Sequence, residues 1–109
     1  MLLVAGETTV KVTGKGVGGR NQEVVLGALL NIQEGAIIAS CGSDGWDNSS
    51  HAGAIGDTET VKKAKKLKLN IQKFLDNNDS FHFFEKVGDG IKTGRLPSNV
   101  SDLMIIIKS

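Results

Sequence analysis

A glycine-rich stretch, Gly14–Glu23 (GKGVGGRNQE), joins an extended segment to an amphipathic one and constrains the chain more than any other feature. Four of its first six residues are glycine, which adopts positive φ readily and allows close approach to the backbone. A helix that starts here turns unpaired N–H groups and the positive end of its dipole toward the loop. Arg20 adds a planar, permanently charged guanidinium that suits a carboxylate or a phosphate. The stretch therefore predicts an anion site at the start of a helix.

The composition is that of one globular domain. The 109 residues carry 13 Lys and Arg against 12 Asp and Glu, a net charge of +1, which favours neither a nucleic-acid surface nor an acidic partner. The lone cysteine, Cys41, excludes an intramolecular disulfide and a cysteine metal cluster. No apolar run approaches the roughly 20 residues that span a bilayer, and the first residues do not read as a signal peptide. We therefore expect a cytoplasmic protein without nucleic-acid or membrane contacts.

Short runs of β-forming residues predict the strands of the fold, at Leu2–Ala5, Thr9–Val12, Ala36–Cys41, Ile91–Thr93 and Leu103–Ile107. The first two flank Gly6 and predict an opening hairpin. Ala36–Cys41 is continuously apolar, which is typical of a strand that is buried on both faces and central in its sheet. Leu103–Ile107 is a second strand of this all-apolar kind. Ala52–Ile55 reads as a short buried segment.

Apolar residues at helical spacing predict helices over about Asn21–Leu30 and Thr58–Leu67, and shorter ones after Asn70 and Ser80. Asp57 and Asn70 are placed as N-caps. Phe81, Phe84 and Val87 give the last helix an apolar face. The lysines of the 62–73 region are interpreted as a solvated surface. Helices that alternate with buried strands predict an α/β fold, a single domain with a mixed β-sheet packed with helices.

A second polar loop, Gly42–His51, follows the first all-apolar strand. Ligands of open α/β sheets gather beyond the carboxyl ends of strands, so this loop is a candidate site. Asp44 and Asp47 have the oxygen ligands that Mg²⁺ prefers, although Asp and Asn among glycines are also ordinary turn residues. No metal ligands are assigned.

The glycines also match a dinucleotide-binding pattern, Gly14-x-Gly16-x-x-Gly19. That pattern requires an acidic residue about 20 positions later, at the end of the second strand. Glu34 comes before the next strand and Asp44 after it. Dinucleotide binding is therefore disfavoured, and a tight strand-to-helix turn with an exposed arginine is the simpler alternative.

Five sequence blocks, taken together and in order, resemble the C-terminal part of type 2 glycerate kinases, the MOFRL domain. The blocks are Gly6–Val10 (GETTV), Gly18–Glu23 (GGRNQE), Gly42–Asp47 (GSDGxD), Asn78–Phe84 (NDSxxFF) and Thr93–Leu103 (TG, then NVxDL). The resemblance covers essentially residues 1–109. It implies an enzyme that phosphorylates D-glycerate at the 2-position with ATP and Mg²⁺, in a family that also carries the label hydroxypyruvate reductase.

The resemblance implies an active-site cleft between this domain and a larger N-terminal kinase domain, which is not in this sequence. Arg20 becomes the catalytic arginine that holds the substrate or the transferring phosphate, and Glu7, Asp44 and Asp47 lie near the cleft. The other predicted substrate- or nucleotide-binding residues belong to the same blocks or to the polar loop, namely Gly18, Gly19, Asn21, Ser50 and Asn99.

The chain departs from the family pattern in two loops. Asn48–His51 is one residue shorter than usual and lacks an acid, and Arg95–Ser98 replaces the usual middle of the later loop. We expect one wall of a kinase cleft that is inactive without its N-terminal partner, supplied covalently or as a separate chain. The alternative is a stand-alone, non-catalytic domain that binds a phosphorylated metabolite or a protein. A stand-alone domain that normally covers a partner is expected to expose an apolar patch and to form a homo-oligomer.

Overall fold

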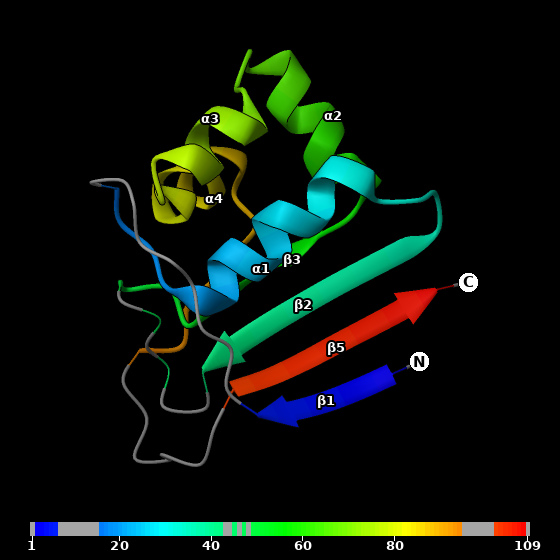
Figure 1. The fold of residues 1–109 in the computed structure, drawn as a ribbon, viewed down its shortest axis with the longest axis vertical. Helices are drawn as coiled ribbons and strands as arrows, with labels where there is room; N and C mark the ends of the chain where they lie inside the picture. Colours follow the sequence, from blue (N-terminus) through cyan, green and yellow to red (C-terminus); the bar gives the residue numbers. More distant parts are fainter. Residues whose placement is uncertain are drawn as a thin grey trace.

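The computed structural model of the chain describes residues 2–6, 16–42, 45, 47, 49–94 and 102–108. In this part of the chain, five strands form one sheet that helices cover (Figure 1). In chain order the elements are β1 (Leu2–Gly6), α1 (Arg20–Ala28), the 3₁₀ helix η1 (Leu29–Asn31), β2 (Ala36–Gly42), β3 (Gly53–Gly56), α2 (Thr58–Lys66), α3 (Ile71–Asp76), α4 (Ser80–Val87), β4 (Gly90–Ile91) and β5 (Asp102–Lys108).

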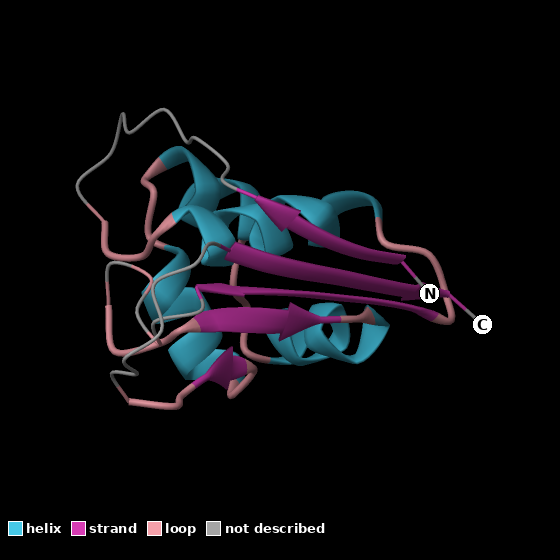
Figure 2. Cartoon of the chain, turned by 90° about the horizontal axis from the view of Figure 1, so that it is seen from below, coloured by secondary structure: helices cyan, strands magenta, loops and turns pink. Residues whose placement is uncertain are grey.

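The strand order is β1-β5-β2-β3-β4, and Figure 2 shows the strands side by side in this order with the helices behind them. The α/β architecture is confirmed, but the expected mixed sheet is not seen, because all four described pairings are antiparallel. β1 and β2 do run in the same direction, since both are antiparallel to β5. The late strand β5 lies between them, so the strands on either side of α1 do not pair with each other.

Two strand predictions need revision. β1 pairs with β5 along its whole length, whereas Thr9–Val12, the other half of the predicted hairpin, lies outside the described residues. β2 is central, as predicted, but it is not buried on both faces. Ile38 and Ser40 are buried, whereas Ile37 is 39% exposed. The alternation arises because the described helices pack against one face of the sheet only.

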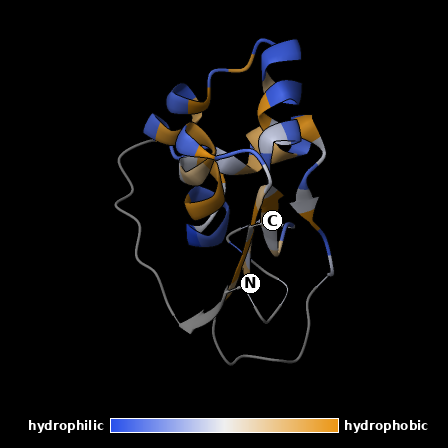
Figure 3. Cartoon of the chain, turned by 90° about the vertical axis from the view of Figure 1, so that its right-hand side faces the viewer, coloured by the Kyte–Doolittle hydropathy of each residue, from blue (hydrophilic) through white to orange (hydrophobic). Residues whose placement is uncertain are grey.

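The predicted helix caps are confirmed. The Asp57 carboxylate accepts the backbone N–H of Thr60 at 3.0 Å, while the Thr60 hydroxyl accepts the Asp57 N–H at 3.2 Å, which forms a capping box at the start of α2. Asn70 caps α3 by accepting the Lys73 N–H at 3.1 Å. The lysines of α2 are largely exposed, and the helix is mostly hydrophilic in Figure 3.

The core lies between the sheet and the helices. Phe83 and Phe84 are fully buried there, and their rings meet edge to face at 5.1 Å. Phe81, predicted on the apolar face of α4, packs instead against the His51 ring at 4.6 Å. None of the helices in the described part of the chain has the length and apolar character needed to cross a bilayer. The buried apolar residues that pack together in this core are Val25, Leu26, Leu29, Ile38, Ala54, Ala64, Phe83, Phe84 and Val87.

We predict opposite effects of alanine at two glycines. A Cβ on Gly53 would collide with the backbone of Ser40 and Cys41 on the neighbouring strand, so Gly53→Ala should cost about 1–3 kcal/mol of unfolding free energy. A Cβ on Gly27, inside α1, would meet no atom within 4 Å. Gly27→Ala should therefore add about 0.5–1 kcal/mol through helix propensity. Urea unfolding of both variants tests this, and a tolerated Gly53→Ala would contradict the packing of β2 on β3.

Candidate functional site

The sequence blocks meet at one end of the sheet. Gly6, the last residue of β1, and Gly42, the last residue of β2, both pair with Asp102, the first residue of β5. Three strand ends that are far apart in the sequence therefore lie side by side. Gly45 packs against Gly94, where a side chain would collide with the Gly94 carbonyl. The blocks at the ends of β1 and β2 and the block that includes β5 thus share one edge.

The glycine-rich loop joins this edge to α4. The Val17 N–H donates to the Asp79 carboxylate at 3.0 Å, and the Phe81 N–H donates to the Val17 carbonyl at 2.9 Å. Gly18 has φ +134°, and a Cβ there would collide with the Ser80 hydroxyl. The close backbone approach that the glycines predicted is therefore made by the chain itself, between the loop and the first turn of α4.

Asp47 occupies the start of α1. One carboxylate oxygen accepts the backbone and side-chain N–H groups of Asn21, both at 3.1 Å. The other accepts the backbone N–H of Gln22 at 2.8 Å and its side-chain N–H at 3.1 Å. Gly19, the N-cap residue, has no side chain to cap the helix. The anion predicted at this helix end is thus a carboxylate of the chain itself, which satisfies orphan donors and complements the helix dipole.

These bonds decide whether Asp47 fits a metal ion. A carboxylate has about four lone-pair positions, and the four N–H donors from Asn21 and Gln22 use them. Asp47 therefore does not fit as a magnesium ligand. Asp44, its predicted companion, lies outside the described residues. Within the described ranges, no three His, Cys, Asp or Glu side chains gather closely enough to hold a metal.

A buried network extends from Asp47 to the core. The Gln22 amide N–H groups face Asp47 and the Ser49 hydroxyl, which turns the Gln22 carbonyl oxygen toward His51 Nδ1 at 3.1 Å. Because that oxygen can only accept, His51 carries a proton on Nδ1. On the other side, the Ser40 hydroxyl donates to the Asn21 carbonyl oxygen at 2.7 Å. The network ties α1 to β2 and to the loop before β3.

Two titratable groups in this region have shifted pKa values. Burial lowers the pKa of His51, Lys92 lowers it further, and Glu85 and Asp47 act in the opposite direction. Burial raises the pKa of Glu23, while the hydrogen bond from Asn78 at 3.4 Å favours its charged form. The Asp47 and Asp79 carboxylates raise the Glu23 pKa further. Burial of the group itself is the largest cause of each shift.

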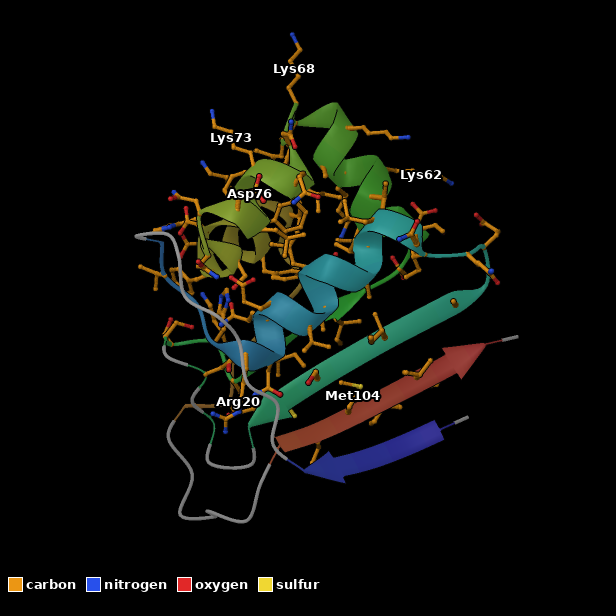
Figure 4. All side chains as sticks on the ribbon, in the orientation of Figure 1. Arg20, Lys62, Lys68, Lys73, Asp76 and Met104 are labelled. Atoms are coloured by element: carbon orange, nitrogen blue, oxygen red, sulfur yellow. The ribbon has the colours of Figure 1, made fainter. Side chains whose placement is uncertain are left out.

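Arg20 is the first residue of α1, and its side chain is exposed. In Figure 4 it lies beside the carboxyl end of β2, and the bond between Asn21 and Ser40 confirms that α1 begins against this strand. The labelled lysines, Lys62, Lys68 and Lys73, project from the opposite end of the molecule. Among the cations labelled in Figure 4, Arg20 is therefore the one that lies at the end of the sheet where the blocks meet.

The other predicted binding residues divide into three groups. Gly18, Gly19 and Asn21 lie at the start of α1 and contact other parts of the chain. Ser50 is exposed on the loop that leads to β3. Glu7, Asp44 and Asn99 lie outside the described residues, so their roles stay predictions.

The sequence patterns did not predict a role for Gln22, whose side chain bonds to Asp47, Ser49 and His51 in the buried network. They indicated a ligand or turn element in the Gly42–His51 loop and did not pair this loop with the helix start. One signal was present. A helix that begins after glycine, without a capping side chain next to it, needs a cap from elsewhere in the fold, and a polar loop rich in Asp and Ser is a suitable source.

We predict that Asp47 stabilises the fold through these bonds. Asp47→Ala leaves buried donors of Asn21 and Gln22 without an acceptor, so it should cost about 1–3 kcal/mol of unfolding free energy. Asp76→Ala, on the exposed face of α3, is the matched control and should stay within about 0.5 kcal/mol. Chemical denaturation measures both. Equal effects of the two substitutions would contradict the capping role.

We also predict a pH dependence from His51. Its pKa is lower in the folded chain than the ordinary value of 6.5, so the unfolded chain binds the proton first as pH falls. Stability should therefore be complete above about pH 6.5 and decline below it. His51→Gln should remove this decline, whereas His82→Gln, at an exposed position, should retain it. Glu23, with its raised pKa, acts in the opposite direction at lower pH. Thermal unfolding between pH 5 and 8 checks the difference, and an unchanged profile for His51→Gln would refute it.

The chain matches the MOFRL family over residues 1–102. It is 42% identical over 107 residues to the D-glycerate 2-kinase of Thermotoga maritima, which covers 95% of this chain and 26% of that protein. It is also 40% identical over 115 residues to the glycerate kinase of Danio rerio, over 97% of this chain and 23% of that protein. The chain thus spans about a quarter of the length of these relatives.

The fold matches solved structures as well. The crystal structure of glycerate kinase from Thermotoga maritima superposes with a TM-score of 0.94 at 40% identity, over 98% of this chain and 27% of that one. The PH0495 protein from Pyrococcus horikoshii superposes with a TM-score of 0.89 at 35% identity, over 98% of this chain and 26% of that one. With the sequence blocks gathered at one edge of this same fold, the chain belongs to the MOFRL family.

Proposed function

We propose that this chain provides one wall of the phosphoryl-transfer cleft of an ATP-dependent D-glycerate 2-kinase. The observation that carries the proposal is the convergence of the family blocks at one end of the sheet, with Arg20 at that edge. The relatives named as glycerate kinases support the reaction. Because the chain matches about a quarter of the length of these relatives, the rest of the enzyme supplies the opposite wall of the cleft. We place the complete kinase in the cytoplasm.

Arg20 is the group that we assign to the reaction. Phosphoryl transfer depends on positioning and on neutralising the charge of the transferring group rather than on covalent chemistry by the protein. An arginine presents parallel N–H donors that bind a carboxylate or a phosphate through two bonds. Arg20 therefore binds either the glycerate carboxylate or the phosphoryl oxygens, and the fixed start of α1 holds its backbone in place.

Asp47 and Asn21 act on the substrate indirectly. Their polar atoms bond to each other and to Gln22 and Ser40, so they have little capacity left for a ligand. We assign them to the support of Arg20 rather than to contact with the substrate. Gly18 and Gly19 keep the loop close to α4 and Asp47. Glu7, Asp44, Ser50 and Asn99 remain proposed contacts of the substrate or nucleotide.

The family resemblance implies ATP as the phosphoryl donor and Mg²⁺ as its metal ion. Mg²⁺ would neutralise phosphate charge in the complete enzyme, and Asp47 is not among its ligands because its lone pairs are used. The chain alone should not phosphorylate D-glycerate, because positioning and charge neutralisation are required from both walls of the cleft.

A hybrid kinase tests the proposal. In it, this chain replaces the matching 26% of the Thermotoga maritima D-glycerate 2-kinase. We expect the hybrid kinase, but not the chain alone, to phosphorylate D-glycerate with ATP in a coupled assay. Arg20→Ala should lower kcat/KM by about 10²–10³-fold, the range for loss of one charge-stabilising donor, and Arg20→Lys should recover part of it.

The control removes a different exposed cation. Lys66→Ala changes the net charge equally, but Lys66 is an exposed residue at the end of α2 and not at the start of α1. It should leave kcat/KM unchanged. A hybrid kinase that keeps full activity with Arg20→Ala, at unchanged melting temperature, would rule out the role assigned to Arg20. Binding of ATP or phosphoglycerate to the chain alone, without activity in the hybrid kinase, would instead favour a non-catalytic binding domain.

A further inference from the structure

The sheet has an apolar face that the described helices do not cover. Its members alternate along the strands with the residues that enter the core, such as Ile38 and Ile106. Cross-strand register joins them into one surface, because Ile37 pairs with Ile107 and Ala39 pairs with both Ile105 and Ile55. We call this surface the outer face. It consists of Ile37, Ala39, Cys41, Ile55, Leu103, Ile105 and Ile107.

The outer face is exposed in this chain. Its large side chains are 36–43% exposed, and they account for five of the eight exposed large hydrophobic residues among those described. Figure 2 views the sheet from this side, with the helices behind the strands. Antiparallel sheets that face water usually place polar residues on the solvated side. Here both faces of β2 and β5 are apolar, which is the pattern of a sheet covered on both sides.

The comparisons indicate what covers it. The glycerate kinase of Thermotoga maritima contains this fold with a TM-score of 0.94, but the fold accounts for only 27% of that chain. Nearly three quarters of the relative therefore lies outside the matching part. The outer face also ends at Cys41 and Leu103, directly next to the paired residues Gly42 and Asp102 of the candidate site. A partner that packs on the outer face thus comes beside the edge where the second wall of the cleft is needed.

We propose that the outer face is the docking surface for the remaining part of the glycerate kinase, which packs an apolar surface of its own against the sheet. This inference rests on the proposed function. The outer-face residues named above carry no charge, so the joint is a hydrophobic layer rather than a set of ion pairs.

Cys41 supplies a reporter, because it is the sole cysteine of this chain and lies on the outer face. Its alkylation by N-ethylmaleimide can be followed by mass spectrometry of the peptide that contains it. In the hybrid kinase the rate should fall by about tenfold or more relative to the isolated chain, since the joint must open before the reagent can enter. Ile105→Asp should restore the rate, because Ile105 is central in the outer face and a carboxylate there resists burial.

Leu67→Asp is the matched control. Leu67 is 51% exposed at the end of α2 and lies outside the outer face, so this variant should leave Cys41 protected. Circular dichroism of the isolated variants establishes that each one folds. If the hybrid kinase does not fold, the same reaction is measured on the intact Thermotoga maritima enzyme, with a cysteine at the position that superposes on Cys41. Rapid alkylation there would overturn the proposal.

The outcomes separate this proposal from the proposed function. An active hybrid kinase with an unprotected Cys41 would overturn the docking surface but not the reaction. A protected Cys41 without kinase activity would support the docking surface and count against the reaction. Protection in the isolated chain that increases with concentration, together with a dimer in sedimentation, would assign the outer face to a second copy and refute the proposed occupant.

Discussion

The Asp47 carboxylate at the start of α1 is the interaction on which the candidate site depends. It caps the N-terminus of α1, a helix that begins after two glycines and has no N-cap side chain of its own. The same bonds tie the loop after β2 to the helix after β1, which the sequence separates by more than twenty residues. A buried carboxylate and buried amide donors are costly when unpaired. The loop and the start of α1 therefore fix each other's position. The bonds of Asp47 to the start of α1 therefore also fix the backbone position of Arg20.

Gln22 and His51 extend this constraint into the core. Gln22 contacts Asp47, Ser49 and His51, so a single amide of α1 holds three residues of the loop before β3. A fully satisfied polar network of this kind specifies one arrangement, since displacing any member leaves a buried group without a partner. The network therefore gives rigidity to a part of the fold that is rich in glycine.

The outer face constrains the molecule in a different way. β2 and β5 present apolar residues to both sides of the sheet, whereas the described helices cover one side. The sequence interpretation of a strand buried on both faces was wrong for the isolated chain, yet the residues that produced it are consistent with a partner in a larger enzyme. The docking proposal accounts for this pattern, because a sheet that is covered on both sides has apolar residues on both faces.

The sequence by itself determined the local elements and the family. The caps at Asp57 and Asn70, the central strand and the helix after the glycines follow from short-range patterns, because propensity and capping act over a few residues. Only the tertiary structure decided that β5 separates β1 from β2, that Asp47 caps α1 and that Phe81 contacts His51. These are long-range pairings, and no periodicity along the chain encodes which distant groups will satisfy one another once water is excluded.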